Sequence, residues 1–135
     1  MQNVTELNKK DSLVVAEEAV KHLLEKKALG VRLFDVREYT SVTEYYVNVT
    51  GRSGAHVAAL SEELADNFSE RGLSPLRIEG RQGNSWILVD YGFLIVNVFD
   101  AQSREFYNFD RLLPAECELG TKHLIDAVDR KLGID

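Results

Sequence analysis

Residues 85–99 read Ser-Trp-Ile-Leu-Val-Asp-Tyr-Gly-Phe-Leu-Ile-Val-Asn-Val-Phe, which is the most apolar stretch of the chain and contains its only tryptophan. Aromatic and β-branched residues fill it, and the pair Tyr91-Gly92 interrupts it. This pattern predicts two strands, 86–90 and 93–99, joined by a tight turn. The second strand is almost continuously apolar, which predicts burial on both of its faces. The hairpin is therefore expected to supply the core of a sheet.

Helices and further strands are predicted on both sides of this hairpin. Apolar residues at helical spacing, together with glycine and proline at the ends, set most of the boundaries. The predicted helices cover 12–28, 55–71, 102–113 and 122–132, and the remaining strands cover 31–36, 45–50 and 76–80. This order predicts an α/β (α+β) fold, with a mixed sheet of about five strands and flanking helices.

A chain of 135 residues is expected to form one compact domain. A domain of this size buries roughly two-thirds of the surface of its unfolded chain, so it needs no disulfide or metal to fold. We predict a flexible polar lead over 1–10, a single domain over 11–114, and an acidic tail segment with a short terminal helix over 115–135.

Charge and composition limit the classes of partner. The 22 acidic and 16 basic residues give a net charge of -6. Free nucleic acid is therefore not an expected partner, because binding to the phosphate backbone needs clustered basic residues. The single cysteine, Cys117, excludes an internal disulfide and fits a reducing compartment. No apolar run approaches the ~20 residues that span a bilayer. We expect a cytoplasmic protein without a membrane partner.

The loop 50–54, Thr-Gly-Arg-Ser-Gly, joins a predicted strand to a predicted helix. Backbone N–H groups at such a helix start can hold a phosphate, and the loop is also typical of nucleotidyltransferases. That activity needs paired acids for a metal ion. Asp35 and Asp90 have no acid two residues further on, and Glu116 and Glu118 lie in the predicted tail beyond the sheet. The sequence favours a structural turn here.

No other residue pattern indicates catalysis. Three histidines, His22, His56 and His123, lie on separate predicted helices without a second ligand at metal-binding spacing. Ser53 is instead predicted to cap the helix that follows it. We therefore expect a protein that is not an enzyme and has no metal, no cofactor and no catalytic residues.

One face of the first hairpin strand mixes a large aromatic residue with an acid. Side chains alternate along a strand, so Trp86, Leu88 and Asp90 share one face while Ile87 and Val89 share the other. The aliphatic face suits a core covered by helices. The other face suits a surface that a partner covers, because protein interfaces are rich in tryptophan, tyrosine and arginine. The alternative is that these aromatic residues pack the core and the edges of the sheet.

The ordered motifs of the chain resemble those of the ribosomal silencing factor, or Iojap/RsfS, family. The matching segments, in order, are Asp35-Val36-Arg37, Tyr45-Tyr46-Val47, Thr50-Gly51-Arg52-Ser53 with His56, Glu79-Gly80, Trp86 to Gly92, Val96 to Phe99, and Arg104-Glu105-Phe106-Tyr107. The resemblance covers roughly 13–113 and leaves the terminal helix outside. The chain departs from the family pattern at Asn97, Phe93 and Leu113.

The resemblance implies a nucleotidyltransferase-like fold without the catalytic acids. It implies binding to the large ribosomal subunit through its fourteenth ribosomal protein, which blocks association with the small subunit and lowers translation under stress. It makes six residues candidates for partner binding: Trp86, Asp90 and Tyr91 first, then Glu79, Arg104 and Tyr107. The alternatives that remain open are a nucleotidyltransferase-type nucleotide-binding enzyme and a homodimeric structural module, and a homodimer is also possible beside ribosome binding.

Overall fold

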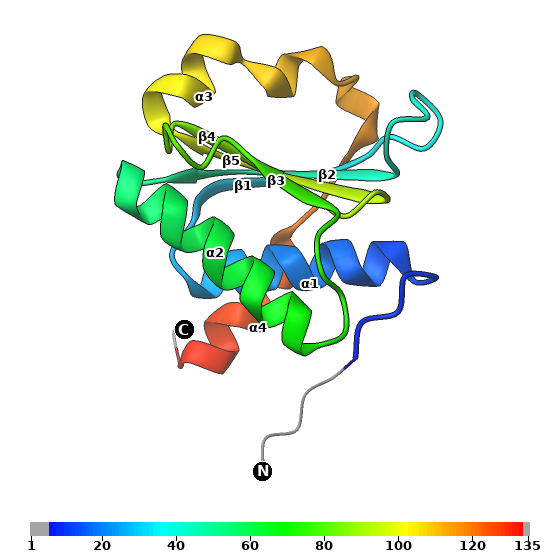
Figure 1. Cartoon of the computed structure of the whole chain (residues 1–135). Helices are drawn as coiled ribbons and strands as arrows, with labels where there is room; N and C mark the ends of the chain where they lie inside the picture. Colours follow the sequence, from blue (N-terminus) through cyan, green and yellow to red (C-terminus); the bar gives the residue numbers. More distant parts are fainter. Residues whose placement is uncertain (1–5, 134–135) are drawn as a thin grey trace.

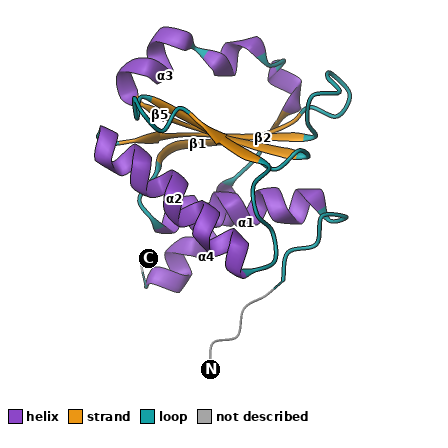
Figure 2. Ribbon diagram, in the orientation of Figure 1, coloured by secondary structure: helices purple, strands orange, loops and turns teal. Residues whose placement is uncertain are grey.

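A six-stranded mixed sheet runs through the middle of the protein, as the computed structural model shows for the described residues, 6–133 (Figures 1 and 2). The strands are β1 (Leu29–Asp35), β2 (Tyr45–Gly51), β3 (Arg77–Glu79), β4 (Trp86–Asp90), β5 (Leu94–Asp100) and β6 (Glu118–Leu119). The helices are α1 (Ser12–Glu25), α2 (Gly54–Glu70), α3 (Ala101–Tyr107) and α4 (Lys122–Leu132), with short 3-10 turns η1 (Phe109–Leu112) and η2 (Ala115–Cys117). The α/β fold class predicted from the sequence is confirmed.

The strand order is β3-β4-β5-β2-β1-β6, and only β2 and β5 run parallel. Figure 1 shows α1, α2 and α4 on one face of this sheet and α3, with the turn after it, on the other. α1 and α2 pack directly on one face and α4 packs on α1, while α3 and the turn after it lie over the other face (Figure 1).

The main core lies between the sheet and the helices α1 and α2. Alternate residues of the central strands point into it and are fully buried: Val47 and Val49 of β2, Ile87 and Val89 of β4, and Val96 and Val98 of β5. Each such side chain contributes roughly 1.5–3 kcal/mol when it is removed from water. Six of the seven residues of β5 are buried, which confirms the predicted burial on both faces.

α1 ends three residues before its predicted end at Ala28. Lys27 takes the left-handed conformation (φ 70°), and the N–H of Ala28 bonds back to the carbonyl of Leu23 at 3.0 Å. This is a helix-ending motif in which glycine is the usual residue, so lysine gave no signal for it. Gly30, predicted to stop the helix, lies inside β1, where the register with β2 shifts.

The helix predicted over 102–113 is divided in two. Asn108 adopts the left-handed conformation (φ 48°, ψ 46°), which ends α3, and η1 follows it. Asparagine tolerates this conformation better than most residues do. The break turns Phe109 and Asp110 toward the sheet instead of continuing the helix.

The segment predicted to form a tail beyond the sheet joins the sheet. Glu118 and Leu119 form β6, which pairs with Phe34 and Leu33 of β1. The prediction that Glu118 lies outside the sheet is therefore wrong, and the sheet has one strand more than expected. α4 has the bounds predicted for it and packs against α1, with Leu124 in the main core.

Half of the predicted polar lead, residues 1–5, lies outside the described residues. Leu7 is described: its N–H donates to the carbonyl of Arg71 at 2.9 Å, and its side chain packs against the core. This part of the chain is thereby tied to the end of α2. Within residues 6–133, no helix is both long and apolar enough to span a membrane.

Candidate functional site: the aromatic and polar face of the sheet

The face of the sheet opposite α1 and α2 carries large aromatic and polar side chains. Pairing in the sheet places Trp86 of β4 beside Phe99 of β5, and Asn97 of β5 beside Asn48 of β2. α3 and η1 cross this face. We call the residues gathered there the aromatic and polar face: Arg32, Tyr46, Asn48, Thr50, Trp86, Asn97, Phe99, Arg104, Phe106, Tyr107, Phe109 and Asp110.

Trp86 is the centre of an aromatic cluster. Its ring centroid lies 4.9 Å from that of Phe99, 4.9 Å from that of Tyr107 and 6.1 Å from that of Phe109. Trp86 is partly exposed, while Tyr107 is 51% exposed and Phe106 78% exposed. The cluster is thus packed on its inner side and open to solvent on its outer side.

A chain of hydrogen bonds leads inward from Trp86. Its indole N–H donates to Asn97 Oδ1 at 3.0 Å, and the amide of Asn97 donates to Asn48 Oδ1 at 3.0 Å. The amide of Asn48 then donates to Asp110 Oδ1 at 2.8 Å. Both asparagines are buried, at 0% and 1% exposure, so these bonds satisfy polar groups that water does not reach.

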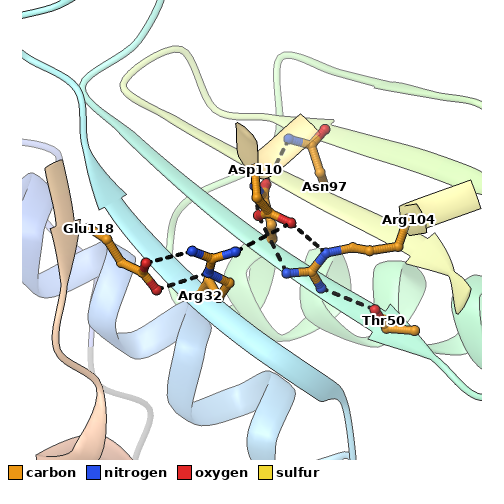
Figure 3. Close-up of polar contacts among 7 residues, drawn as sticks. Arg32, Thr50, Asn97, Arg104, Asp110 and Glu118 are labelled. Atoms are coloured by element: carbon orange, nitrogen blue, oxygen red, sulfur yellow. Dashed lines mark hydrogen bonds and ion pairs between the residues drawn. The ribbon is translucent and has the colours of Figure 1, made fainter. Parts of the chain in front are cut away.

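Two arginines also contact Asp110 (Figure 3). Arg104 Nε donates to Asp110 Oδ2 at 2.9 Å, and Arg104 Nη1 donates to Thr50 Oγ1 at 3.0 Å. Arg32 lies 3.8 Å from Asp110 Oδ2 and makes two hydrogen bonds to Glu118, at 2.9 and 2.6 Å. These contacts fasten α3 and η1 to β1, β2 and β6.

The electrostatics favour an ionised Asp110. Burial raises the pKa of its carboxyl group, but the hydrogen bonds from Arg104 and Asn48 and the charges of Arg104 and Arg32 together outweigh burial, so the pKa lies below its usual range. Arg104 and Asp110 are only 14% and 9% exposed, so solvent screens this pair less than a surface ion pair. Arg32 and Glu118 are more exposed, and we assign their pair little of the stability.

We expect acid to weaken the attachment of η1. Because the folded pKa of Asp110 is depressed, its carboxylate adds stability that is present above its unfolded pKa, about 3.9, and is lost as the pH falls through the lower folded pKa. Urea unfolding between about pH 5 and pH 2 measures this loss. In Asp110→Asn, the part of the slope of unfolding free energy against pH that comes from Asp110 is expected to disappear. The part that comes from other carboxylates stays. An unchanged slope would contradict the assignment.

The structure brings some of the predicted contact residues together. Trp86 and Tyr107 lie in ring contact. Asp90 and Glu79 lie at the β3–β4 edge, where Arg77 contacts their carboxylates at 3.1 and 3.3 Å. These four residues lie on the aromatic and polar face or at its edge. Their contact with a partner stays a prediction.

Arg104 and Tyr91 differ from that group. Arg104 is largely buried and committed to Asp110 and Thr50, so its part is to hold α3 in place. Tyr91 is 4% exposed and packs against Phe68 of α2, on the other side of the sheet. Its hydroxyl has no hydrogen-bond partner within residues 6–133, and burial raises the pKa of that hydroxyl strongly. We therefore leave Tyr91 out of the proposed contact surface.

The loop at 50–54 uses its polar groups internally. Ser53 caps α2 by accepting from the N–H of His56, as predicted. The N–H of Arg52 donates to His56 Nδ1 at 2.9 Å, and His56 Nε2 lies 2.9 Å from the carbonyl of Lys26. His56 thus connects the start of α2 to the end of α1. Nowhere in the described chain do three or more His, Cys, Asp or Glu side chains form a group that could hold a metal ion.

In the polar half of this face, the sequence singled out Arg104 but not the buried network that Arg104 joins. Asn48 and Asn97 each interrupt an apolar strand, which is a weak signal of a buried polar pair. Asp110 gave none, because the break at Asn108 that turns it inward was not predicted. Phe109 was missed for the same reason.

The fold and this face define an α/β domain with one open aromatic surface above a buried polar network. The family model for "Ribosomal silencing factor during starvation" matches residues 9–132. The ribosomal silencing factor RsfS of Bacillus subtilis (strain 168) is 30% identical over 106 residues, which is 78% of this chain and 87% of the relative. This chain therefore belongs to the ribosomal silencing factor family, whose members are ribosome-associated regulators and not known enzymes.

Two further similarities agree with this assignment. A crystal structure of a Chromobacterium violaceum protein superposes with a TM-score of 0.70 at 26% identity, covering 78% of this chain and 86% of that one. The mouse protein named "Mitochondrial assembly of ribosomal large subunit protein 1" is 25% identical over 93 residues, which is 67% of this chain and 41% of the mouse protein. The family match includes α4, so the expectation that the terminal helix lies outside the resemblance is wrong.

Proposed function

We propose that this protein binds the large ribosomal subunit through its fourteenth ribosomal protein and sterically blocks association with the small subunit. Translation would then fall without any chemical step, in the cytoplasm and under nutrient stress. Family membership supports a ribosomal role, and the name of the mouse relative connects a similar protein to the large subunit.

The observation that carries the proposal is the open aromatic cluster around Trp86. Its inner side is fixed by Phe99 and Phe109, while Tyr107 and Phe106 stay exposed. Fixed aromatic anchors lose little conformational entropy on binding and are frequent centres of protein interfaces. Arg77, Glu79 and Asp90 give this surface a charged edge.

The net charge of -6 supports the choice of a basic protein as the partner. Opposite potentials speed the encounter of two proteins and fix their relative orientation. We therefore expect the association rate to fall as salt is added, because exposed charges are screened within about 10 Å at 0.1 M ionic strength.

A subunit-joining assay tests the proposal directly. Purified protein is added to large subunits, small subunits are then supplied, and light scattering or sucrose gradients measure the joined ribosomes. We expect joining to fall with dose and binding to appear on large subunits alone. Undisturbed joining at saturating dose would refute steric blocking. Titration with nucleoside triphosphates and Mg²⁺ tests the alternative enzyme, and light scattering of the protein alone tests the homodimer.

A further inference from the structure

The hydrogen bonds from Trp86 to Asp110 all run in one direction. Trp86 donates to Asn97, Asn97 donates to Asn48, and Asn48 donates to Asp110. An indole N–H can only donate, and an ionised carboxylate can only accept. Each asparagine amide has one donor side and one acceptor side. With these two ends fixed, only one orientation of both amides satisfies every bond.

We propose that Asp110 is a positioning residue for Trp86, acting through the buried pair Asn48 and Asn97. The carboxylate on η1 fixes the amide of Asn48, which fixes the amide of Asn97, which presents the acceptor that holds the indole ring. We call the hydrogen-bonded series Trp86–Asn97–Asn48–Asp110 the relay. The consequence for partner binding rests on the proposed function, but the relay itself is a property of the free protein.

The contacts around Asp110 predict the effect of replacing it with asparagine, its neutral isostere. The Oδ2 position faces Arg104 Nε at 2.9 Å and Arg32 at 3.8 Å, whereas the Oδ1 position faces Asn48 at 2.8 Å and Arg104 Nη2 at 3.4 Å. In Asp110→Asn the amide oxygen is expected to stay toward the guanidinium groups. The new NH₂ group then faces Asn48.

This change reverses the relay. Asn48 must rotate to offer its oxygen to the new NH₂ group, and its own NH₂ group then faces Asn97. Asn97 must rotate in turn, which places its NH₂ group against the indole N–H of Trp86. Two donors face each other, so Trp86 loses its acceptor in a site where Asn97 is only 1% exposed.

Nuclear magnetic resonance of the free protein tests the relay, because the single tryptophan gives a single indole N–H signal. In Asp110→Asn we expect this signal to move upfield and its exchange with solvent to rise on the order of tenfold, as expected for a lost buried hydrogen bond. Thr50→Val is the matched control. It removes the bond between Arg104 and Thr50, which also holds α3, but leaves the relay unchanged.

An unmoved indole signal in folded Asp110→Asn would overturn the proposal, as would an equal shift in Thr50→Val. A second measurement needs no variant. In the wild-type protein the side-chain NH₂ protons of Asn48 and Asn97 should be protected from exchange, because each group donates inside the fold. Rapid exchange of both would also overturn the relay.

Binding to large subunits separates this inference from the proposed function. We expect Asp110→Asn to bind about tenfold more weakly than Thr50→Val, because Trp86 is no longer held in its binding orientation. If the indole signal shifts but binding is unchanged, Asp110 does not position Trp86 for a partner. If Trp86→Ala itself binds as well as wild type, the proposed contact surface fails while the relay stands.

Discussion

Trp86→Ala is expected to weaken binding to the large ribosomal subunit by at least about 2 kcal/mol, or about 30-fold. The substitution removes the ring that Phe99, Tyr107 and Phe109 hold at the centre of the open cluster. Tyr107 then loses one of the two rings against which it packs and keeps Phe106. The loss is expected mainly in the dissociation rate, since most interface mutations act there.

The fold is expected to survive this substitution, because Trp86 points away from the core between the sheet and α2. The neighbours Ile87 and Val89, which do point into that core, are fully buried and unchanged. Circular dichroism checks the fold, and cosedimentation with purified large subunits measures binding. Val42→Ala is the matched control, since Val42 is an apolar side chain 65% exposed in the loop between β1 and β2. A folded Trp86→Ala that cosediments like Val42→Ala would contradict the assignment.

The hairpin at β4 and β5 was predictable because its signals are local. Strand alternation placed Trp86 and Asp90 on one face and Ile87 and Val89 on the other, as the structure has them. α4 was equally predictable, since its apolar residues recur at helical spacing and Gly133 ends it in a left-handed conformation. In such segments each residue's environment follows from its nearest neighbours in the sequence.

The relay was not predictable, because its partners are far apart in the chain. Asn97 and Asn48 are separated by 49 positions, and Asn48 and Asp110 by 62. Periodicity says which face a residue occupies, but not which side chain it meets there. β6 was missed for a related reason: two residues are too few to show any period, and only pairing with β1 makes them a strand.

Tyr91 follows strand alternation, which places it on the buried face of the sheet. It follows Asp90 directly in sequence, and its ring packs against Phe68 of α2. Counting positions along β4 assigns Tyr91 to the face of Ile87 and Val89, which is where it lies. The predicted contact rested on the family resemblance and on tyrosine's frequency in interfaces, and neither says whether this position is buried.

Gly80→Ala is expected to destabilise the protein by about 3 kcal/mol. This is a large effect for an exposed position. Gly80 has a φ of 90°, where a Cβ atom costs roughly 1–2 kcal/mol. A Cβ atom there would also lie 2.0 Å from the carbonyl oxygen of Trp86. That oxygen belongs to the backbone of β4, so no side-chain rotation relieves the clash, and β3 and β4 must separate.

Gly83→Ala is the matched control, because it lies in the same turn. The nearest atom to a Cβ at Gly83 is Ser85 Oγ at 3.8 Å, an ordinary contact. We expect this variant to change stability by less than about 0.5 kcal/mol. Urea unfolding of both variants measures the difference. The clash at Gly80 acts on the carbonyl of Trp86 itself, so any Gly80→Ala that stays folded should also show a shifted indole signal. Equal stability of the two variants would contradict the prediction, because it would mean that β3 and β4 accommodate the added Cβ atom at little cost.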